Sequence, residues 1–252
     1  MYTILGRLGE GRFSRVWLAS RPDGRHVAMK EDFQEKGEKE SWSTLAHEAA
    51  VLYHLNRIGG VGPTLHWFEG GPQPHLVMSL LLPCPSLVWP QMVQAIERVH
   101  ACGVVHRDIK PEHFMWDPRG DTLVLTDFGF AVFMDQDQKD QKDQKDQKEK
   151  EKGQHIVGSP RYCSVHVHEG QAYRRRDDLL SALYCTVDLV PYRGGETASV
   201  SQSACAHPRN RWYGAQKEQA HMETLVPPTR LQVVRRLYAL SAYAAPDYAG
   251  LM

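Results

Sequence analysis

The segment that decides the fold is Val104-Val105-His106-Arg107-Asp108-Ile109-Lys110-Pro111-Glu112-His113. In it, an apolar pair leads into His-Arg-Asp, and a lysine stands two residues after the aspartate. A second charged motif, Thr126-Asp127-Phe128-Gly129, follows a short distance later. The interval predicts a strand pair, Phe114–Trp116 and Leu123–Thr126, because the turn-forming run Asp-Pro-Arg-Gly-Asp lies between them. We therefore expect a hairpin between the two charged motifs.

The two motifs resemble the catalytic loop and the metal-binding loop of protein kinases. Transfer of a phosphoryl group needs a carboxylate near the attacking hydroxyl, a cation near the moving group and a carboxylate that holds Mg²⁺. The resemblance gives these three roles, in that order, to Asp108, Lys110 and Asp127. It also implies ATP as the phosphate donor and Mg²⁺ as the metal, with Mn²⁺ as a second choice.

A glycine motif near the start of the chain extends the resemblance. Residues 9–16 have the form G-x-G-x-x-S-x-V, in which glycines let backbone amides approach phosphate oxygens closely. Alone, this motif fits an ordinary glycine-rich hairpin as well. Val27-Ala28-Met29-Lys30, however, alternates as a strand and ends in lysine, much like the kinase V-A-I-K. The resemblance therefore assigns nucleotide contacts to Gly9, Gly11, Ser14, Val16, Ala28 and Lys30.

A helix is predicted from about Ser43, because Leu45, Ala49, Leu52 and Leu55 recur at helical spacing. Glu48 lies on this helix, and the resemblance pairs it with Lys30 so that Lys30 can hold the α- and β-phosphates of ATP. A solvated helix glutamate is the alternative interpretation of Glu48.

Two short strands are predicted next, Thr64–Glu69 and His75–Leu80. By analogy with kinases, the Met78 side chain would lie beside the adenine of ATP. The Ser79 carbonyl and the Leu81 amide would hydrogen-bond to the base, and Met115 would belong to the same site. A helix is predicted over Gln91–His100 before the catalytic segment.

The later part of the chain narrows the resemblance to the casein kinase 1 family. Gly158-Ser159-Pro160-Arg161-Tyr162 and Arg175-Arg176-Asp177-Asp178-Leu179 are similar to the family's G-T-A-R-Y and R-R-D-D-L. Like the family, the chain lacks Ala-Pro-Glu, and residues 190–194 and 246–248 resemble its L-P-W-x-G and P-D-Y. The resemblance covers essentially the whole chain.

Two further roles come from this family alone. Asp178 would brace the backbone of the catalytic loop, although a helix N-cap is also compatible with its position. Arg161 would bind an anionic group on acidic or previously phosphorylated protein substrates.

The expected fold is α+β, a bilobal protein-kinase fold with ATP bound in the cleft between the lobes. Residues 1–80 would form a small β-rich N-lobe and residues 81–252 a mainly α-helical C-lobe. Residues 135–152 repeat Asp-Gln-Lys without an apolar side chain, so they cannot bury enough surface to offset the entropy of ordering. We interpret them as a disordered insertion in the activation segment. Solvated filler and a regulatory or partner-binding role are both compatible with this composition, as is a single charged helix.

Composition limits the cellular setting. The formal net charge is zero, which gives no global argument for binding nucleic acid or an acidic membrane. The five cysteines form no close pairs, which argues against a zinc site or a disulfide framework and suits a reducing compartment. No signal peptide is evident, and no apolar run approaches the ~20 residues that span a bilayer. We expect a soluble, intracellular, monomeric protein, cytoplasmic or nuclear, whose partners are protein substrates.

His113 stands where the kinase family has the asparagine that holds the second Mg²⁺. Imidazole is a poor ligand for Mg²⁺ and suits softer metals better. Three functions therefore stay open: a weakened serine/threonine kinase, a pseudokinase that binds nucleotide or acts as a scaffold, and a small-molecule phosphotransferase. Residues 158–162 argue against the third, because a peptide-docking segment would have no purpose there. Lys110 favours serine or threonine acceptors over tyrosine, as in the family's serine/threonine members.

Overall fold

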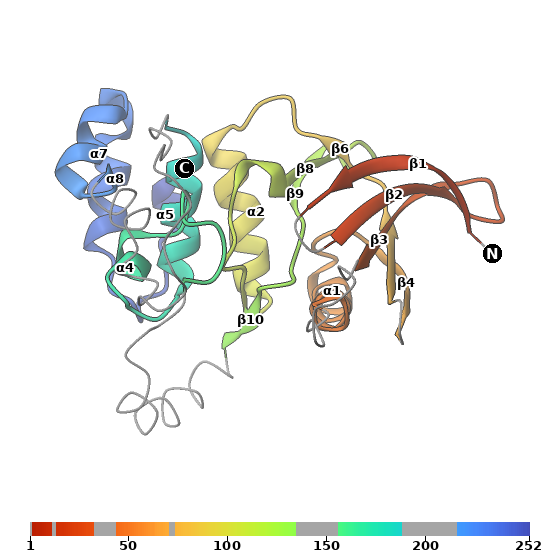
Figure 1. Cartoon of the computed structure of the whole chain (residues 1–252). Helices are drawn as coiled ribbons and strands as arrows, with labels where there is room; N and C mark the ends of the chain where they lie inside the picture. The colour runs from red at the N-terminus through yellow and green to blue at the C-terminus, as the bar shows by residue number, and fades with distance from the viewer. Residues whose placement is uncertain (1, 12–13, 33–43, 71–73, 135–155, 188–215) are drawn as a thin grey trace, which may run out of the picture. The chain divides into compact units, whose positions relative to one another are not determined.

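The computed structural model describes residues 2–11, 14–32, 44–70, 74–134, 156–187 and 216–252 (Figure 1). Its contacts divide the chain into two compact units, residues 1–85 with 112–130, and residues 86–111 with 131–252. The first unit is built mainly of strands and the second mainly of helices, so the predicted α+β class is confirmed. The repeat at 135–152 and the segment at 190–194 lie outside the described residues.

The first unit contains a five-stranded antiparallel sheet, in the order β1 (Thr3–Glu10), β2 (Ser14–Ser20), β3 (His26–Asp32), β5 (His75–Ser79) and β4 (Leu65–Glu69). Val16 lies opposite Lys30, and Ala28 lies opposite Met78. Because side chains alternate along a strand and opposite residues share a face, these four residues lie on one face of the sheet. The register thus groups four residues that the sequence assigned to nucleotide binding.

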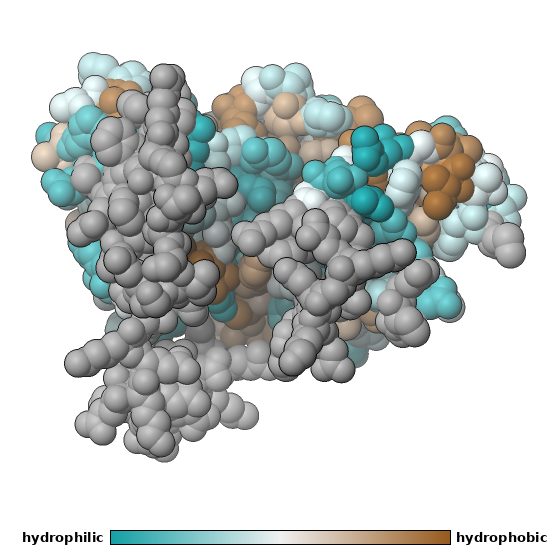
Figure 2. All heavy atoms as spheres, in the orientation of Figure 1, coloured by the Kyte–Doolittle hydropathy of each residue, from teal (hydrophilic) through white to brown (hydrophobic). Residues whose placement is uncertain are grey.

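The other face of this sheet carries a small apolar core. Ala19, Val27, Met29 and Val77 are buried there, and Tyr2 and Trp17 pack against them. The edge strand β1 also carries three large apolar side chains that are each about half exposed, Ile4, Leu5 and Leu8. Figure 2 shows hydrophobic surface over this end of the sheet.

Helix α1 (Leu45–Gly59) packs against β4 and β5, and it buries the four apolar positions predicted from its spacing. Gly60 ends it in the left-handed region, at φ 59°. The Asn56 side chain then joins the helix to the sheet. Its amide donates to the carbonyls of Val61 and Pro63 at 2.9 and 3.1 Å, and its oxygen accepts from the Leu65 amide at 2.7 Å.

A second, three-stranded sheet completes the first unit, in the order β6 (Leu82–Pro83), β8 (Phe114–Asp117) and β9 (Thr122–Leu125). Strands β8 and β9 form the hairpin expected between the charged motifs, with Phe114 opposite Leu125. The hairpin therefore brings the end of the first motif beside the start of the second.

The second unit is mainly helical (Figure 1). Within the described residues, its helices are α2 (Trp89–Ala101), α4 (Val165–His168), α5 (Arg175–Cys185), α7 (Gln219–Leu225) and α8 (Leu231–Ala239), with short 3₁₀ turns η3 (Pro228–Arg230) and η4 (Ala249–Leu251). Strand β7 (Val104–Val105) pairs with β10 (Val132–Phe133). The 3₁₀ turn η1 (Pro111–His113) lies where the chain passes from the second unit to the first.

Helix α2 begins two residues before the predicted Gln91. The reason is Pro90, which lies in the first turn of the helix. A proline is tolerated there because the amide that it lacks has no partner within the helix at that position. The apolar face is otherwise as predicted, since Met92, Ile96 and Val99 are fully buried.

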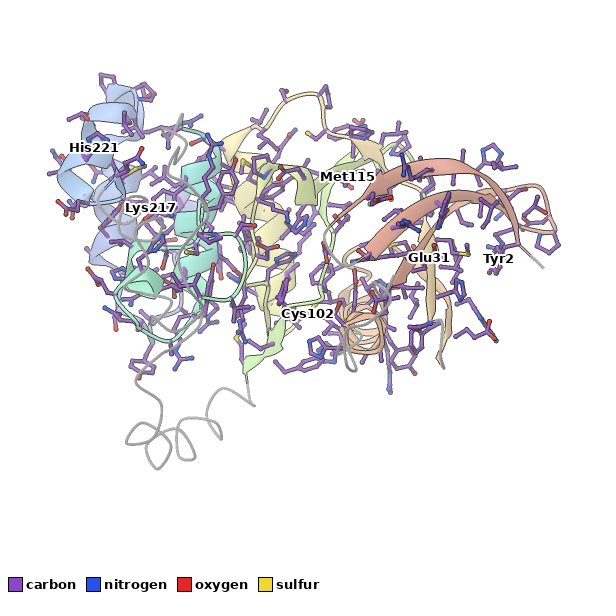
Figure 3. All side chains as sticks on the ribbon, viewed as in Figure 1. Tyr2, Glu31, Cys102, Met115, Lys217 and His221 are labelled. Atoms are coloured by element: carbon purple, nitrogen blue, oxygen red, sulfur yellow. The ribbon has the colours of Figure 1, made fainter. Side chains whose placement is uncertain are left out.

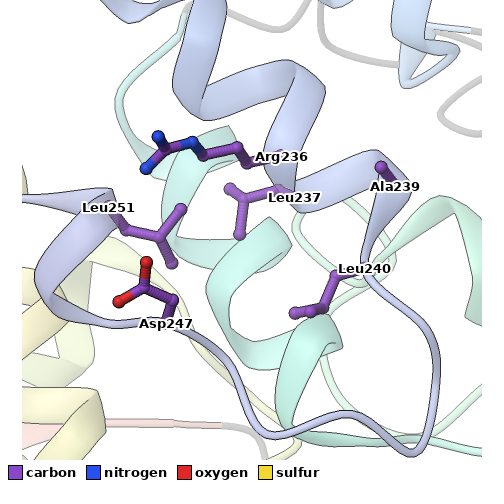
Figure 4. A pocket seen from close by; sticks show the side chains of 6 residues that line it. All are labelled: Arg236, Leu237, Ala239, Leu240, Asp247 and Leu251. Atoms are coloured by element: carbon purple, nitrogen blue, oxygen red, sulfur yellow. The ribbon is translucent and has the colours of Figure 1, made fainter.

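A cavity of about 320 Å³ lies beside α8 and the C-terminal turn (Figure 4). It is lined by Arg236, Leu237, Ala239, Leu240, Asp247 and Leu251. Its two charged side chains hold the turn itself: Asp247 Oδ1 accepts from the Gly250 amide at 3.1 Å, and Arg236 donates to the Gly250 carbonyl. The cavity thus belongs to the packing of the C-terminus.

None of the helices in the described ranges is long and apolar enough to cross a bilayer.

Candidate active site

A buried lysine organises the charged side chains of the first unit. Lys30 Nζ lies 2.7 Å from Glu48 Oε2 and 2.9 Å from Asp127 Oδ1. The Lys30 and Glu48 side chains are only 8% and 1% exposed, so the interpretation of Glu48 as a solvated helix residue is wrong. Strand β3, helix α1 and the loop after β9 each supply one member of this group.

The ion pairs change the proton affinity of all three groups. Burial opposes the charge of Lys30, but Glu48 and Asp127 outweigh it and raise the pKa of Lys30 above its ordinary value. Burial also opposes the charge of Asp127, yet Lys30 and His113 hold the pKa of that carboxyl well below its ordinary value. Burial raises the pKa of Glu48, against the attraction of Lys30. The group is therefore a shared cation between two carboxylates.

The backbone of Asp127 is held in the left-handed region at φ 64°, which is unfavourable for a residue other than glycine. Phe128 is fully buried against the loop after α1, where a Cβ added to Gly62 would lie 3.3 Å from both the Phe128 ring and the Leu52 side chain. The tight packing of Phe128 thus fixes the backbone turn that presents the Asp127 carboxylate.

His113 is brought to the same carboxylate by the hairpin. The Thr126 amide donates to the His113 carbonyl at 3.0 Å, directly before Asp127. His113 Nε2 lies 3.1 Å from Asp127 Oδ2, and Lys30 contacts the other oxygen. At this distance the imidazole and the carboxylate are hydrogen-bonded to each other, and both are side-chain types that can bind a divalent ion. Within the described residues, no group of three or more His, Cys, Asp or Glu side chains could hold a metal.

The other predicted nucleotide residues also belong to the first unit. Gly9 and Gly11 are exposed, and the Gly11 amide donates to the Ser14 carbonyl at 2.8 Å, which closes the hairpin of the glycine motif. Met78, Ser79 and Leu81 are buried along and after β5, and Met115 lies on β8 beside β6 (Figure 3). Their contacts with adenine stay predictions.

In the second unit, both oxygens of Asp108 are engaged. Lys110 Nζ lies 3.2 Å from Oδ2, and the Ser159 amide donates to Oδ1 at 2.8 Å. Gly158 has φ +83°, and a Cβ added there would lie 2.5 Å from the Arg107 carbonyl. Only glycine therefore allows residues 158–159 to approach the catalytic segment this closely. Arg161 follows, with its guanidinium 5.7 Å from the centre of the Tyr162 ring.

Asp178 binds the catalytic segment from α5. Its carboxylate accepts from the amides of His106 and Arg107 at 2.7 and 2.9 Å, which is the bracing contact expected from the sequence. Arg107 needs this support because its φ is 71°. The N-cap interpretation of Asp178 is wrong: Arg174 is the N-cap of α5, and Asp177 accepts from its amide at 2.7 Å.

Sequence patterns did not predict the support that His100 and Tyr248 give to Asp178. His100, at the end of α2, places Nε2 2.9 Å from Asp178 Oδ2, and its Nδ1 lies 2.6 Å from the Tyr248 hydroxyl. Trp89 adds a further tie, since its indole donates to the Leu251 carbonyl at 2.6 Å. The P-D-Y motif marked Tyr248 as a family feature, but nothing in the local pattern linked it to a residue 148 positions earlier.

Comparison with known proteins supports the resemblance to protein kinases. A sequence profile of the protein kinase domain matches residues 85–227. Among curated proteins, the chain is similar to casein kinase 1-like protein HD16 of Oryza sativa subsp. japonica, with 30% identity over 234 residues. The alignment covers 79% of this chain and 32% of the rice protein, so the chain spans about a third of the length of that relative.

Proposed function

Because the chain belongs to the protein kinase family and is similar to a casein kinase 1-like member, we propose that it transfers the γ-phosphate of ATP to serine or threonine hydroxyls of proteins. The observation that carries this proposal is the shared ion pair of Lys30 with Glu48 and Asp127. Such a group is costly to desolvate, so its presence supports a chain that uses the lysine to bind phosphate oxygens.

In the first unit, Lys30 would bind phosphate oxygens, and Glu48 would keep its ammonium in place at 2.7 Å. Asp127 and His113 would hold the divalent metal. A metal held there would supply positive charge that neutralises the phosphates. Because His113 supplies nitrogen where Mg²⁺ prefers oxygen, we expect Mn²⁺ to support activity better than Mg²⁺.

In the second unit, Asp108 would orient the acceptor hydroxyl and accept its hydrogen bond. Lys110, 3.2 Å from that carboxylate, would stabilise the negative charge that develops on the phosphoryl oxygens. The Ser159 amide keeps Asp108 from rotating, and Asp178 fixes the backbone that carries it. Each residue thus has a role that its observed contacts support.

Protein substrates follow from the family, and their chemistry is the finer part of the proposal. Arg161 stands in the segment that follows Ser159, where a guanidinium would attract acidic side chains or phosphate groups on the acceptor peptide. We therefore propose acidic proteins of the casein type as the first substrates to test.

One observation favours a second function, nucleotide binding without transfer. Lys30 and His113 occupy both oxygens of Asp127. A metal must displace or share at least one of these contacts. If His113 holds Asp127 too firmly, nucleotide would bind while phosphate transfer would be lost.

The deciding experiment measures transfer of the γ-phosphate from ATP to casein, in Mg²⁺ and separately in Mn²⁺. Asp108→Ala is the control, because it removes the group that orients the hydroxyl. Transfer by the parent protein that the control lacks supports the kinase. No transfer with either metal, while ATP still raises the melting temperature, supports the second function and contradicts the first.

A further inference from the structure

A second buried lysine lies in the second unit, away from the residues assigned to phosphate transfer. Lys217 stands just before α7 and is fully buried (Figure 3). Its Nζ donates to the carbonyls of Pro160 and Cys163, at 3.0 and 2.7 Å, and lies 3.0 Å from His168 Nε2. No local sequence pattern predicted this arrangement, because at least 49 residues separate Lys217 from each of these three partners.

Tyrosine side chains from two helices contact Lys217. Its ammonium lies 5.0 Å from the centre of the Tyr184 ring of α5, and the Tyr238 hydroxyl of α8 donates to the Lys217 carbonyl. Burial lowers the pKa of Lys217 to about 7, which reflects the cost of placing an amine here. A chain that keeps a lysine at such a cost obtains something from its hydrogen bonds that an apolar side chain would not supply.

The two carbonyls that Lys217 holds flank Arg161 and Tyr162 on both sides. The same short segment folds on itself, since the amides of Tyr162 and Cys163 both donate to the Ser159 carbonyl at 2.9 and 3.0 Å. Ser159 in turn donates to Asp108. Lys217 therefore holds this segment at Pro160 and Cys163, while Ser159, near its start, holds the proposed catalytic carboxylate of Asp108.

We propose that Lys217 is a positioning residue for the acceptor peptide. It holds segment 158–163 in the conformation that receives a protein substrate; the family resemblance implies peptide docking for residues 158–162 of this segment. This inference rests on the proposed kinase function, because it names what orients the substrate of that reaction. Lys217 would act through the backbone carbonyls of Pro160 and Cys163 rather than by contact with the substrates.

Hydrogen bonding, rather than charge, carries this role. Burial lowers the pKa of His168 to about 3, so its imidazole is neutral at any ordinary assay pH. A neutral Lys217 amine still has two N–H bonds for the two carbonyls, and an ammonium has three. A side chain that donates hydrogen bonds should therefore restore part of the function, whereas an apolar chain of similar length should not.

The test compares Lys217→Met, which keeps the length of the side chain without a donor, with Lys217→Gln, which keeps a shorter donor. His221→Ala is the matched control, because His221 is an exposed residue of the adjacent helix α7 (Figure 3). Steady-state kinetics with an acidic casein peptide and ATP give KM for each substrate and kcat. Hydrogen exchange, read by mass spectrometry over residues 158–164 and over α5, reports the backbone without needing activity.

We expect Lys217→Met to raise the KM for peptide about tenfold, as the loss of its two hydrogen bonds to backbone carbonyls implies. The KM for ATP and kcat should stay close to the parent values, and exchange over residues 158–164 should become faster while exchange over α5 does not. Lys217→Gln should recover part of both changes, and His221→Ala should change neither.

Unchanged peptide KM and unchanged exchange in a folded Lys217→Met protein would overturn the inference. Equal losses in every kinetic constant, or failure of both Lys217 variants to fold, would make Lys217 a general core residue and would overturn it too. If the parent protein transfers no phosphate, the kinase function fails on its own. The exchange experiment then still decides whether Lys217 holds segment 158–163.

Discussion

At the scale of single residues, Lys30 has the largest predicted effect on stability. Lys30→Met leaves Glu48 and Asp127 without their shared cation, and breaking a buried ion pair costs about 3–5 kcal/mol. Calorimetry or chemical denaturation at pH 8 should show a loss of this size. Arg25→Met, which removes an exposed charge from the β2–β3 turn, should change the free energy of unfolding by less than about 0.5 kcal/mol.

The pH dependence of this loss has a definite sign. In the parent protein, the lowered pKa of Asp127 gives stability that is present above pH ~4 and lost in stronger acid. The raised pKa of Lys30 gives stability that is present below pH ~10 and lost in stronger base. Without Lys30, the pKa values of both carboxyls rise, so the deficit should be larger at pH 8 than at pH 5. A deficit that shrinks as pH rises would contradict the assignment.

His113 allows a residue-scale test of metal preference. His113→Asn replaces the imidazole that contacts Asp127 Oδ2 with an amide whose oxygen suits Mg²⁺. We expect Mg²⁺-supported kcat to rise about tenfold, and the advantage of Mn²⁺ over Mg²⁺ to disappear, as changes around a metal site commonly shift affinity by this factor or more. Isothermal titration of ATP with each metal gives a readout that does not depend on turnover. A fall in kcat with both metals would mean that His113 has an adapted role.

At the scale of elements, the approach of residues 158–159 to the catalytic segment depends on one glycine. Gly158→Ala places a Cβ 2.5 Å from the Arg107 carbonyl, so the hydrogen bond from the Ser159 amide to Asp108 must break. A displacement of about 1 Å at a catalytic group lowers kcat on the order of a hundredfold. Gly24→Ala is the matched control, because Gly24 has nearly the same φ, +81°, with open space around it. The control should lose only stability, and equal kcat values for the two variants would refute the role of this approach.

His100 joins α2 to α5 and to the C-terminal turn, and the loss of one of its hydrogen bonds should have a smaller effect on stability. Tyr248→Phe removes the hydroxyl that lies 2.6 Å from His100 Nδ1, and a single hydrogen bond of this kind contributes about 1 kcal/mol. The melting temperature should fall by about 2–4 °C. Tyr243→Phe is the control, because Tyr243 is exposed and keeps its ring over Arg174 in the variant. Equal shifts for the two variants would show that the His100 contact carries no weight.

Element periodicity and motif spacing predicted the strands β3, β4, β5, β8 and β9 and the helices α1 and α2, because those signals are local. The four apolar positions of α1 are buried as their spacing indicated, and the β8–β9 hairpin joins the motifs as expected. Long-range support was invisible for the same reason. Nothing near Lys217 or His100 marks them, since their partners lie far away in the sequence. The family resemblance gave metal positions to both His113 and Asp127, but it did not predict the direct contact between them.

At the scale of the whole molecule, the predicted site residues divide between the two compact units. Lys30, Glu48, His113 and Asp127 lie in the first unit, whereas Asp108, Lys110 and Ser159 lie in the second. The resemblance to protein kinases predicted the α+β class, with a strand-rich early part and a helical later part. It could not predict that residues 112–130 group with the first unit, because that follows from pairing of β8 with β6.

This division predicts that nucleotide binding and phosphate transfer can be separated. ATP with Mn²⁺ at 100 times its Kd should stabilise the protein by about 2.7 kcal/mol and raise its melting temperature by about 5–10 °C. Asp127→Asn should abolish the part of this shift that needs metal, because it removes a charged ligand beside His113. Asp108→Asn should keep the full shift while it loses transfer, since Asp108 would face the acceptor rather than ATP. A parent protein that shifts equally with and without metal would contradict the metal site, and loss of the shift in Asp108→Asn would contradict the separation of roles.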